Sequence, residues 1–170
     1  MIPCKNRIMA KGPSQPPDSA GFLIAQVGAY AAMRFAEALK PHGFTPHDAG
    51  ILRLLSVSPG LSQQQMAQRL RIYASRLVGV LDDLQQRGWI ERRPSAVDRR
   101  FYELYLTKEG EAALQTISQV ARKHHADLFS SLTEQERSTL AAMLRRVAEQ
   151  QGLTAGVHPG YSQEEKPHRS

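Results

Sequence analysis

The chain has 170 residues and a formal net charge of +6, which is the size of one ordinary domain with room for a buried core. Its single cysteine, Cys4, excludes an intramolecular disulfide, and no apolar run is long enough to cross a membrane. The first residues lack the apolar segment of a signal peptide, so we expect a cytoplasmic protein with no membrane partner.

The two ends of the sequence differ in composition from its middle. Residues 1–18 are rich in Pro, Lys, Arg and Ser without periodicity, which predicts a flexible basic N-terminal arm. Residues 152–170 are rich in Gly, Pro, His and charged side chains, which predicts a flexible C-terminal tail. The folded domain is therefore expected over residues 19–151.

The first expected helix, residues 19–40, contains the stretch GFLIAQVGAYAAMRFAEALK and is apolar on nearly every side. A helix that buries only one face is amphipathic, so a helix that is apolar all round must be covered all round. A domain of this size has few elements with which to cover it. The simplest covering is a second copy of the chain, and the sequence thus predicts a homodimer.

Two short helices with clear start signals follow. Thr45 can cap the first of them, with Pro46 at the first helical position and Asp48 completing a capping box, and Ser58-Pro59-Gly60 ends it. The next helix is expected to begin at Ser62, with Gln65 as its capping partner, and to end near Leu70.

A fourth helix is expected over residues 75–87, with an inner stripe of Leu77, Val80, Leu81 and Leu84. Gly88 supplies the left-handed residue that ends many helices. A hairpin follows, with WIER as one strand, RPSAVDRR as the turn and FYELYL as the return strand. Alternation places Tyr102, Leu104 and Leu106 on one face of that strand.

Two further helices complete the domain. Thr107 can cap the fifth, which repeats Leu114, Ile117, Ala121, His124 and Leu128 at the spacing of a coiled-coil seam. The last begins with TEQE, a capping box formed by Thr133 and Glu136. The predicted fold class is therefore mainly α with a small β-hairpin (α+β): a winged helix-turn-helix with long terminal helices.

Positive charge is concentrated on the predicted helix-turn-helix and hairpin. Between residues 69 and 100 the chain carries four acids and eight arginines, at positions 69, 71, 76, 87, 92, 93, 99 and 100. Such a concentration suits contact with DNA phosphates, and a helix fits the major groove. The candidates at the start of the fourth helix are Tyr73, Ser75, Arg76 and Gly79: Ser75 for phosphate or bases, Arg76 for guanine, and Gly79 for close approach.

The stretch LVGVLDDLQQRGWIERRPSAVDRRFYELYLTKEG resembles the recognition helix and wing of MarR-type transcriptional regulators. The matching positions are Leu84, Gly88, Trp89, Ile90, Arg92, Asp98, Arg99, Arg100, Leu104, Leu106, Thr107 and Gly110. The resemblance covers about residues 20–150. Relatives often carry a Pro or a polar residue where Tyr73 and Ala74 stand, so their operator sequences do not transfer to this chain.

The resemblance implies a homodimer that binds pseudo-palindromic double-stranded DNA and usually represses nearby genes. Residues 19–40 and 108–150 would form the dimerisation region, and residues 45–106 the DNA-binding part. The resemblance places Arg93, Asp98, Arg99 and Arg100 on a wing, where Arg99 and Arg100 are candidates for the minor groove and phosphates. Asp98, which repels phosphate, is expected to hold the shape of the wing tip.

The resemblance also implies release from DNA by a small, often aromatic and anionic effector bound between the dimerisation and DNA-binding parts. Tyr30 and His47 are the candidates for lining that pocket. Alternatives within the same fold are a redox regulator acting through Cys4 and a metal-responsive regulator using histidines such as His42, His47, His124 or His125.

The sequence gives little support to two other classes of protein. The chain lacks a Gly-rich phosphate loop, HExxH, GxSxG and paired-cysteine motifs, so we expect neither an enzyme nor a bound cofactor or metal. A winged-helix module that binds other proteins and no longer binds DNA is the remaining alternative. The arginines of the predicted wing argue against it.

Overall fold

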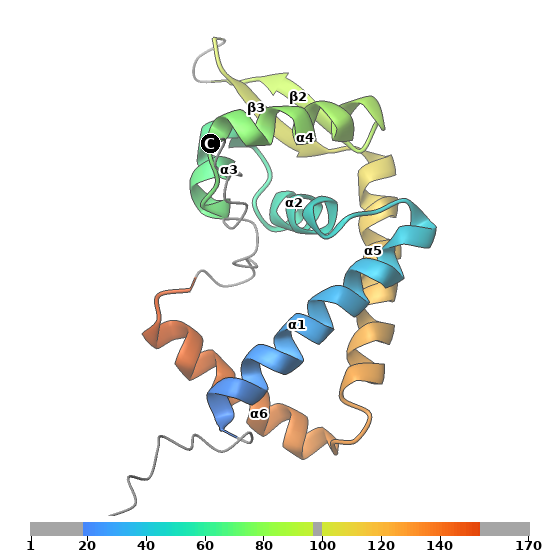
Figure 1. The fold of residues 1–170 in the computed structure, drawn as a ribbon. Coiled ribbons are helices and arrows are strands. Elements are labelled where there is room, and N and C mark those ends of the chain that lie inside the picture. The colour runs from blue at the N-terminus through green and yellow to red at the C-terminus, as the bar shows by residue number, and fades with distance from the viewer. Residues whose placement is uncertain (1–18, 97–99, 154–170) are drawn as a thin grey trace, which may run out of the picture. The chain divides into compact units, whose positions relative to one another are not determined.

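The computed structural model describes residues 19–96 and 100–153. The elements follow in the order α1 (Ala20–Leu39), η1 (Lys40–His42), α2 (Pro46–Val57), β1 (Leu61–Ser62), α3 (Gln63–Leu70), α4 (Ala74–Gln86), β2 (Ile90–Pro94), β3 (Tyr102–Leu106), α5 (Lys108–Leu128) and α6 (Glu134–Gln150) (Figure 1). Two compact units meet within α1: one ends at Met33, and the other begins at Arg34 and contains every other element.

The first unit contributes most of α1. Its large apolar side chains are all exposed by about two fifths or more of their surface: Phe22, Leu23, Ile24, Val27, Tyr30 and Met33. The last residue of α1, Leu39, is fully buried in the core of the second unit. The expected first helix is therefore confirmed, and much of the apolar surface of this helix is exposed in a single copy of the chain.

Local capping signals fix where the helices begin. Thr45 and Asp48 form the predicted capping box of α2, and Ser62 with Gln65 and Thr133 with Glu136 form those of α3 and α6. Each box satisfies amide groups that have no partner inside the helix. Gly88 adopts a φ of 72°, as its predicted role at the end of α4 requires.

The core of the second unit lies among α2, α3, α4, α5 and the sheet. Its fully buried side chains are Leu39, Ile51, Leu52, Leu55, Met66, Leu70, Leu77, Leu81, Leu84, Ile90 and Leu104. The predicted inner stripe of α4 is thus confirmed for its three leucines, whereas Val80 is only partly buried. Along α5, Ile117 is the one residue of the predicted seam that is buried. Gly110 and Ala113, which are not part of that seam, are buried as well.

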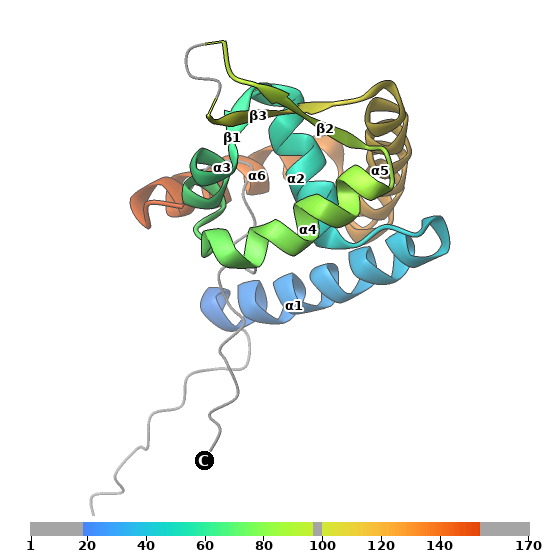
Figure 2. The ribbon, with the colours of Figure 1, turned by 90° about the horizontal axis from the view of Figure 1, so that it is seen from above.

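The sheet has three antiparallel strands in the order β1-β3-β2 (Figure 2). Leu61 pairs with Leu104, and Ile90 pairs with Leu106. The two-residue β1 was not predicted, since so short a strand shows no alternation. The assignment of Arg93 and Pro94 to the turn was wrong: both lie in β2, because they pair with Glu103 and Tyr102.

Candidate nucleic-acid interface

Helices α3 and α4 form the helix-turn-helix. α3 ends at Arg71, whose φ of 55° is left-handed, and whose amide donates to the carbonyl oxygens of Ala67 and Gln68. Among the described residues, Arg71 is the one non-glycine with a positive φ. Ile72 packs against the core beside it, and Tyr73 precedes α4 with 77% of its side chain exposed. The turn thus presents Tyr73 at the start of α4.

The outward face of α4 carries the side chains that the sequence singled out. Ser75, Arg76 and Gly79 are exposed, whereas Leu77 and Leu81 point into the core. A Cβ added to Gly79 would meet no atom within 4 Å, so backbone is accessible there. Val78 is also exposed and was missed, although residues 75, 78 and 79 share a helical face.

Arg87, Arg92 and Arg93 form ion pairs with acids of this region. Arg92 Nη2 lies 2.6 Å from Asp82 Oδ1, which fastens β2 to the second half of α4. Arg93 pairs with Glu91, its neighbour but one on β2. These pairs neutralise part of the excess charge, and they give Arg92 a structural role between wing and helix.

Arg87, at the end of α4, makes the most extensive set of these contacts. One guanidinium nitrogen lies 3.4 Å from both Asp48 and Asp83, and another donates to the carbonyl oxygen of Gly43. The guanidinium carbon also lies 3.8 Å from the centre of the Trp89 ring. Asp48 is a buried carboxylate that also caps α2, so Arg87 joins the end of α4 to the start of α2.

The wing is the β2–β3 hairpin. The amide of Ser95 donates to the carbonyl oxygen of Phe101 at 2.9 Å and closes the hairpin beyond the last strand pair. Arg100 is exposed beside it, as are Phe101 and Tyr102. The guanidinium carbon of Arg93 lies 4.5 Å from the centre of the Tyr105 ring. Asp98 and Arg99 lie outside the described residues.

Gly110 attaches the base of the wing to α5. A Cβ at this position would lie 1.9 Å from the carbonyl oxygen of Trp89, so only glycine fits. The same carbonyl accepts from the amide of Thr107 at 3.1 Å, and the Thr107 hydroxyl donates to Gly88 while accepting from the amide of Gly110. The cap at Thr107 is therefore confirmed, and it joins α4, the wing and α5.

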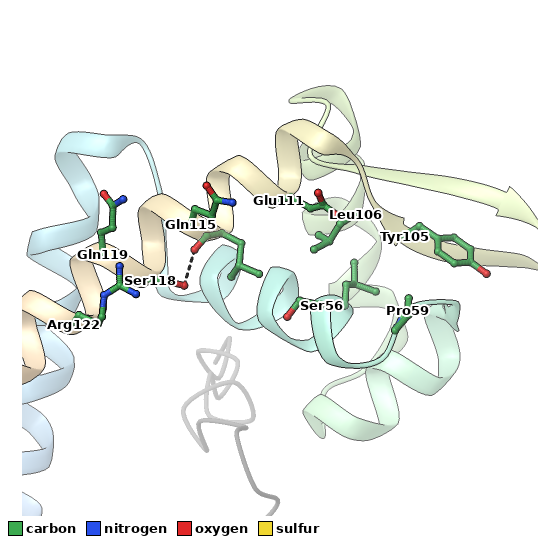
Figure 3. A pocket seen from close by; sticks show the side chains of 11 residues that line it. Ser56, Pro59, Tyr105, Leu106, Glu111, Gln115, Ser118, Gln119 and Arg122 are labelled. Atoms are coloured by element: carbon green, nitrogen blue, oxygen red, sulfur yellow. Dashed lines mark hydrogen bonds between the residues drawn. The ribbon is translucent and has the colours of Figure 1, made fainter.

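A cavity of about 790 Å³ lies between α2, β3 and α5 (Figure 3). Its described lining combines apolar and hydrogen-bonding groups with one cation and one carboxylate: Leu55, Ser56, Pro59, Tyr105, Leu106, Glu111, Leu114, Gln115, Ser118, Gln119 and Arg122. Neither Tyr30 nor His47 lines it. Tyr30 is exposed on α1, and His47 is exposed in the first turn of α2, so sequence spacing did not locate this cavity.

Histidines do not gather into a ligand set in the described part of the chain. Over residues 19–96 and 100–153, no three His, Cys, Asp or Glu side chains stand together as metal ligands would. The His124 ring instead lies 5.6 Å from that of Phe35, and the His125 ring lies 4.9 Å from that of Phe129. Cys4 lies outside the described residues. None of the described helices has the length and apolarity needed to cross a membrane.

Known proteins resemble this chain in sequence and in fold. The sequence pattern of the MarR family matches residues 42–100. A protein of Thauera aromatica, named for regulating the hcr operon, is 36% identical over 135 residues, which are 79% of this chain and 81% of that protein. The chain belongs to the MarR family. The similar proteins are named as transcriptional regulators, and the winged helix-turn-helix fold expected from the sequence is confirmed.

Solved structures with this fold include complexes with DNA. Rv2887 of Mycobacterium tuberculosis, in complex with DNA, matches with a TM-score of 0.67 and 29% identity, over 76% of this chain and 97% of that one. The repressor CouR, bound to a 23-mer duplex, matches with a TM-score of 0.68 and 30% identity, over 76% and 92% of the two chains. This MarR-family chain thus has the fold of proteins solved on DNA.

Proposed function

We propose that the protein is a homodimeric transcriptional repressor that binds pseudo-palindromic DNA through α4 and the wing. The observation that carries the proposal is the start of α4, where Ser75, Arg76 and Gly79 are exposed together beside the exposed Tyr73. Arginine can bond guanine with two parallel hydrogen bonds, and an open glycine allows close approach to the groove. The DNA complexes of Rv2887 and CouR support the same use of this fold.

The wing adds a second point of contact in this proposal. Arg100 is exposed next to the hairpin tip, and Arg99 precedes it in the sequence. Arginines at such a tip suit the narrow, negative minor groove. We expect Arg99→Ala to weaken operator binding and lower its salt dependence while the dimer persists. Unchanged affinity and unchanged salt dependence in a fluorescence-anisotropy titration would refute the role of Arg99.

Homodimer formation would cover the exposed apolar side chains of α1. Six such residues lie on that helix, and Met143, Leu144 and Val147 are exposed on α6. Apolar surface of this extent on two long helices favours association. Val27→Glu should therefore shift the sedimentation coefficient toward that of a monomer, whereas Gln26→Glu, the same charge on the neighbouring position, should not. A dimer that survives Val27→Glu would remove α1 from the interface.

Dimerisation would set two measurable properties of DNA binding: the spacing of the contacted grooves and the dependence on salt. Two recognition helices should meet major-groove faces about 34–36 Å apart. Two copies at +6 each carry +12, so affinity should fall steeply as salt rises. Purified protein is incubated with genomic fragments, and the retained duplexes give the operator. Failure to retain any duplex at low salt would refute DNA binding and favour a protein-interaction module.

The cavity between α2, β3 and α5 is the proposed effector site. Its volume suits a small organic molecule, and Arg122 could hold a carboxylate while the leucines contact an apolar ring. Release from DNA requires the effector to bind one arrangement of the two DNA-binding parts of the dimer better than the other. Aromatic carboxylates such as benzoate are the first probes. Release that Arg122→Gln abolishes supports this site, and release that Arg122→Gln leaves unchanged refutes it.

A further inference from the structure

Tyr105 belongs to the cavity and to the wing at the same time. Its side chain lines the cavity, at the opposite end from Gln119 and Arg122 (Figure 3). Its ring carries the guanidinium of Arg93, 4.5 Å from the ring centre. One ring thus touches both the space for an effector and an arginine of the wing.

The hydroxyl group of Tyr105 is held from two sides. It donates to Glu103 Oε2 at 2.8 Å. It also approaches Gly60 so closely that a Cβ there would lie 2.9 Å from the oxygen. Gly60 has a φ of 81° and its amide donates to the carbonyl oxygen of Leu104 at 2.9 Å. The ring is therefore fixed between the turn that follows α2 and the wing strand β3.

Hydrogen bonds extend this arrangement toward the wing tip. Bonds from Ser95 and from Tyr105 hold the pKa of the Glu103 carboxyl below its usual range, and the bond to Glu103 raises the pKa of the Tyr105 hydroxyl. Glu103 is also the cross-strand partner of Arg93. Ser95 closes the hairpin beyond the last strand pair. Contacts therefore run from the cavity through Tyr105 to Glu103, Arg93 and Ser95.

We infer that Tyr105 is the positioning residue through which the occupied cavity changes the wing. A molecule that fills the Tyr105 end of the cavity displaces the ring, and Arg93 and Glu103 lose their contacts with it. The wing then no longer presents its arginines in the geometry that suits DNA. This inference rests on the proposed function, because it concerns how operator binding is regulated.

A covalent probe tests the inference without a known effector. Ser56 lines the cavity, and Cys4 is the only native thiol, so Ser56→Cys in a Cys4→Ser protein gives one attachment point. Benzyl methanethiosulfonate then forms a disulfide with that thiolate, releases methanesulfinate, and places an aromatic ring in the cavity. Operator affinity is measured by fluorescence anisotropy before and after modification. Coupling between sites is commonly about 5–150-fold, so we expect modification to weaken binding at least about 5-fold.

Two substitutions separate a coupling role from a merely structural one. Tyr105→Leu removes the ring beneath Arg93, and the modified and unmodified proteins should then bind DNA within about 2-fold of each other. Tyr105→Phe keeps the ring and should restore the response that Tyr105→Leu removes. Gln119→Cys, modified with the same reagent at the opposite end of the cavity, is the matched control and should respond less than Ser56→Cys.

The outcomes distinguish the inference from the proposed function. If modification weakens DNA binding equally with and without the Tyr105→Leu substitution, the cavity acts by another route, and the inference alone is overturned. No weakening in the protein that keeps Tyr105, or a Tyr105→Phe protein that behaves like Tyr105→Leu, would also overturn it. If Tyr105→Leu does not fold, Arg93→Gln replaces it, because removing the guanidinium must abolish the same response. An unmodified protein that binds no DNA refutes the proposed function and the inference together.

Discussion

Replacing Gly110 with alanine should destabilise the protein strongly, although alanine favours helix by about 1 kcal/mol over glycine. The new Cβ would lie 1.9 Å from the Trp89 carbonyl oxygen, and real Cβ atoms do not approach other atoms closer than 3.0 Å. The start of α5 and Trp89 would have to separate by roughly 1 Å, since neither contact atom belongs to a flexible side chain. That movement also lengthens the bond from the Thr107 amide to the Trp89 carbonyl, now 3.1 Å.

Overpacking costs about 1–3 kcal/mol and a lost hydrogen bond about 1 kcal/mol, whereas the helix preference of alanine returns about 1 kcal/mol. We therefore expect the free energy of unfolding to fall by about 1–3 kcal/mol. Urea denaturation at a fixed protein concentration measures it, because association also contributes to stability. Gly79→Ala is the matched control: its Cβ meets nothing within 4 Å. That variant should gain about 0.5–1 kcal/mol. Equal stabilisation of both variants would refute the argument from close approach.

Further predictions concern local conformation and charge. Arg71→Gly should raise the free energy of unfolding by about 0.5–1 kcal/mol in urea denaturation, because glycine adopts the φ of 55° without strain; a clear loss would show that the Arg71 side chain matters more. Thr45→Ala should lower the melting temperature by the equivalent of about 1 kcal/mol by removing the α2 cap, and an unchanged melting temperature would contradict this. Hydrogen bonds from the backbone amide and the hydroxyl of Thr133 lower the pKa of Glu136 from its ordinary 4.5. The stability that ionised Glu136 gives the fold is therefore fully present above pH 4.5 and is lost as the pH falls through the lowered pKa. The stability difference between the protein and Glu136→Gln should therefore change below pH 4.5, and a flat difference in acid denaturation would exclude this role.

Features that depend on neighbouring residues could be predicted from the sequence. The capping boxes at Thr45, Ser62 and Thr133 each use a partner three residues away, so a short stretch contains the whole interaction. The left-handed Gly88 follows from the same kind of local rule. The long helices followed from their apolar spacing, and the exposed start of α4 followed from the period of its leucines.

Features that depend on distant residues could not be predicted in this way. Arg87 and Asp48 are 39 positions apart, and Arg92 and Asp82 are 10 apart, so counting charges could not show which arginines are paired within the protein. Gly110 was recognised as part of a family pattern, but its reason, the carbonyl of Trp89, appears only in three dimensions. The cavity is lined by residues from α2, β3 and α5, which are far apart in the sequence. The expectation that Tyr30 and His47 line an effector pocket therefore did not identify it.

A comparison of operator binding between two arginine-to-alanine variants tests the central claim most directly. Arg76 is exposed at the start of α4, and Arg34 on α1, with 56% of its side chain exposed, is the matched control. Fluorescence anisotropy with the retained operator, repeated across salt concentrations, gives the affinity and its salt dependence. Arg76→Ala should weaken binding, by about 1–3 kcal/mol if Arg76 bonds guanine, whereas Arg34→Ala should leave binding unchanged. Equal effects of the two substitutions, or none from Arg76→Ala, would contradict DNA recognition by α4.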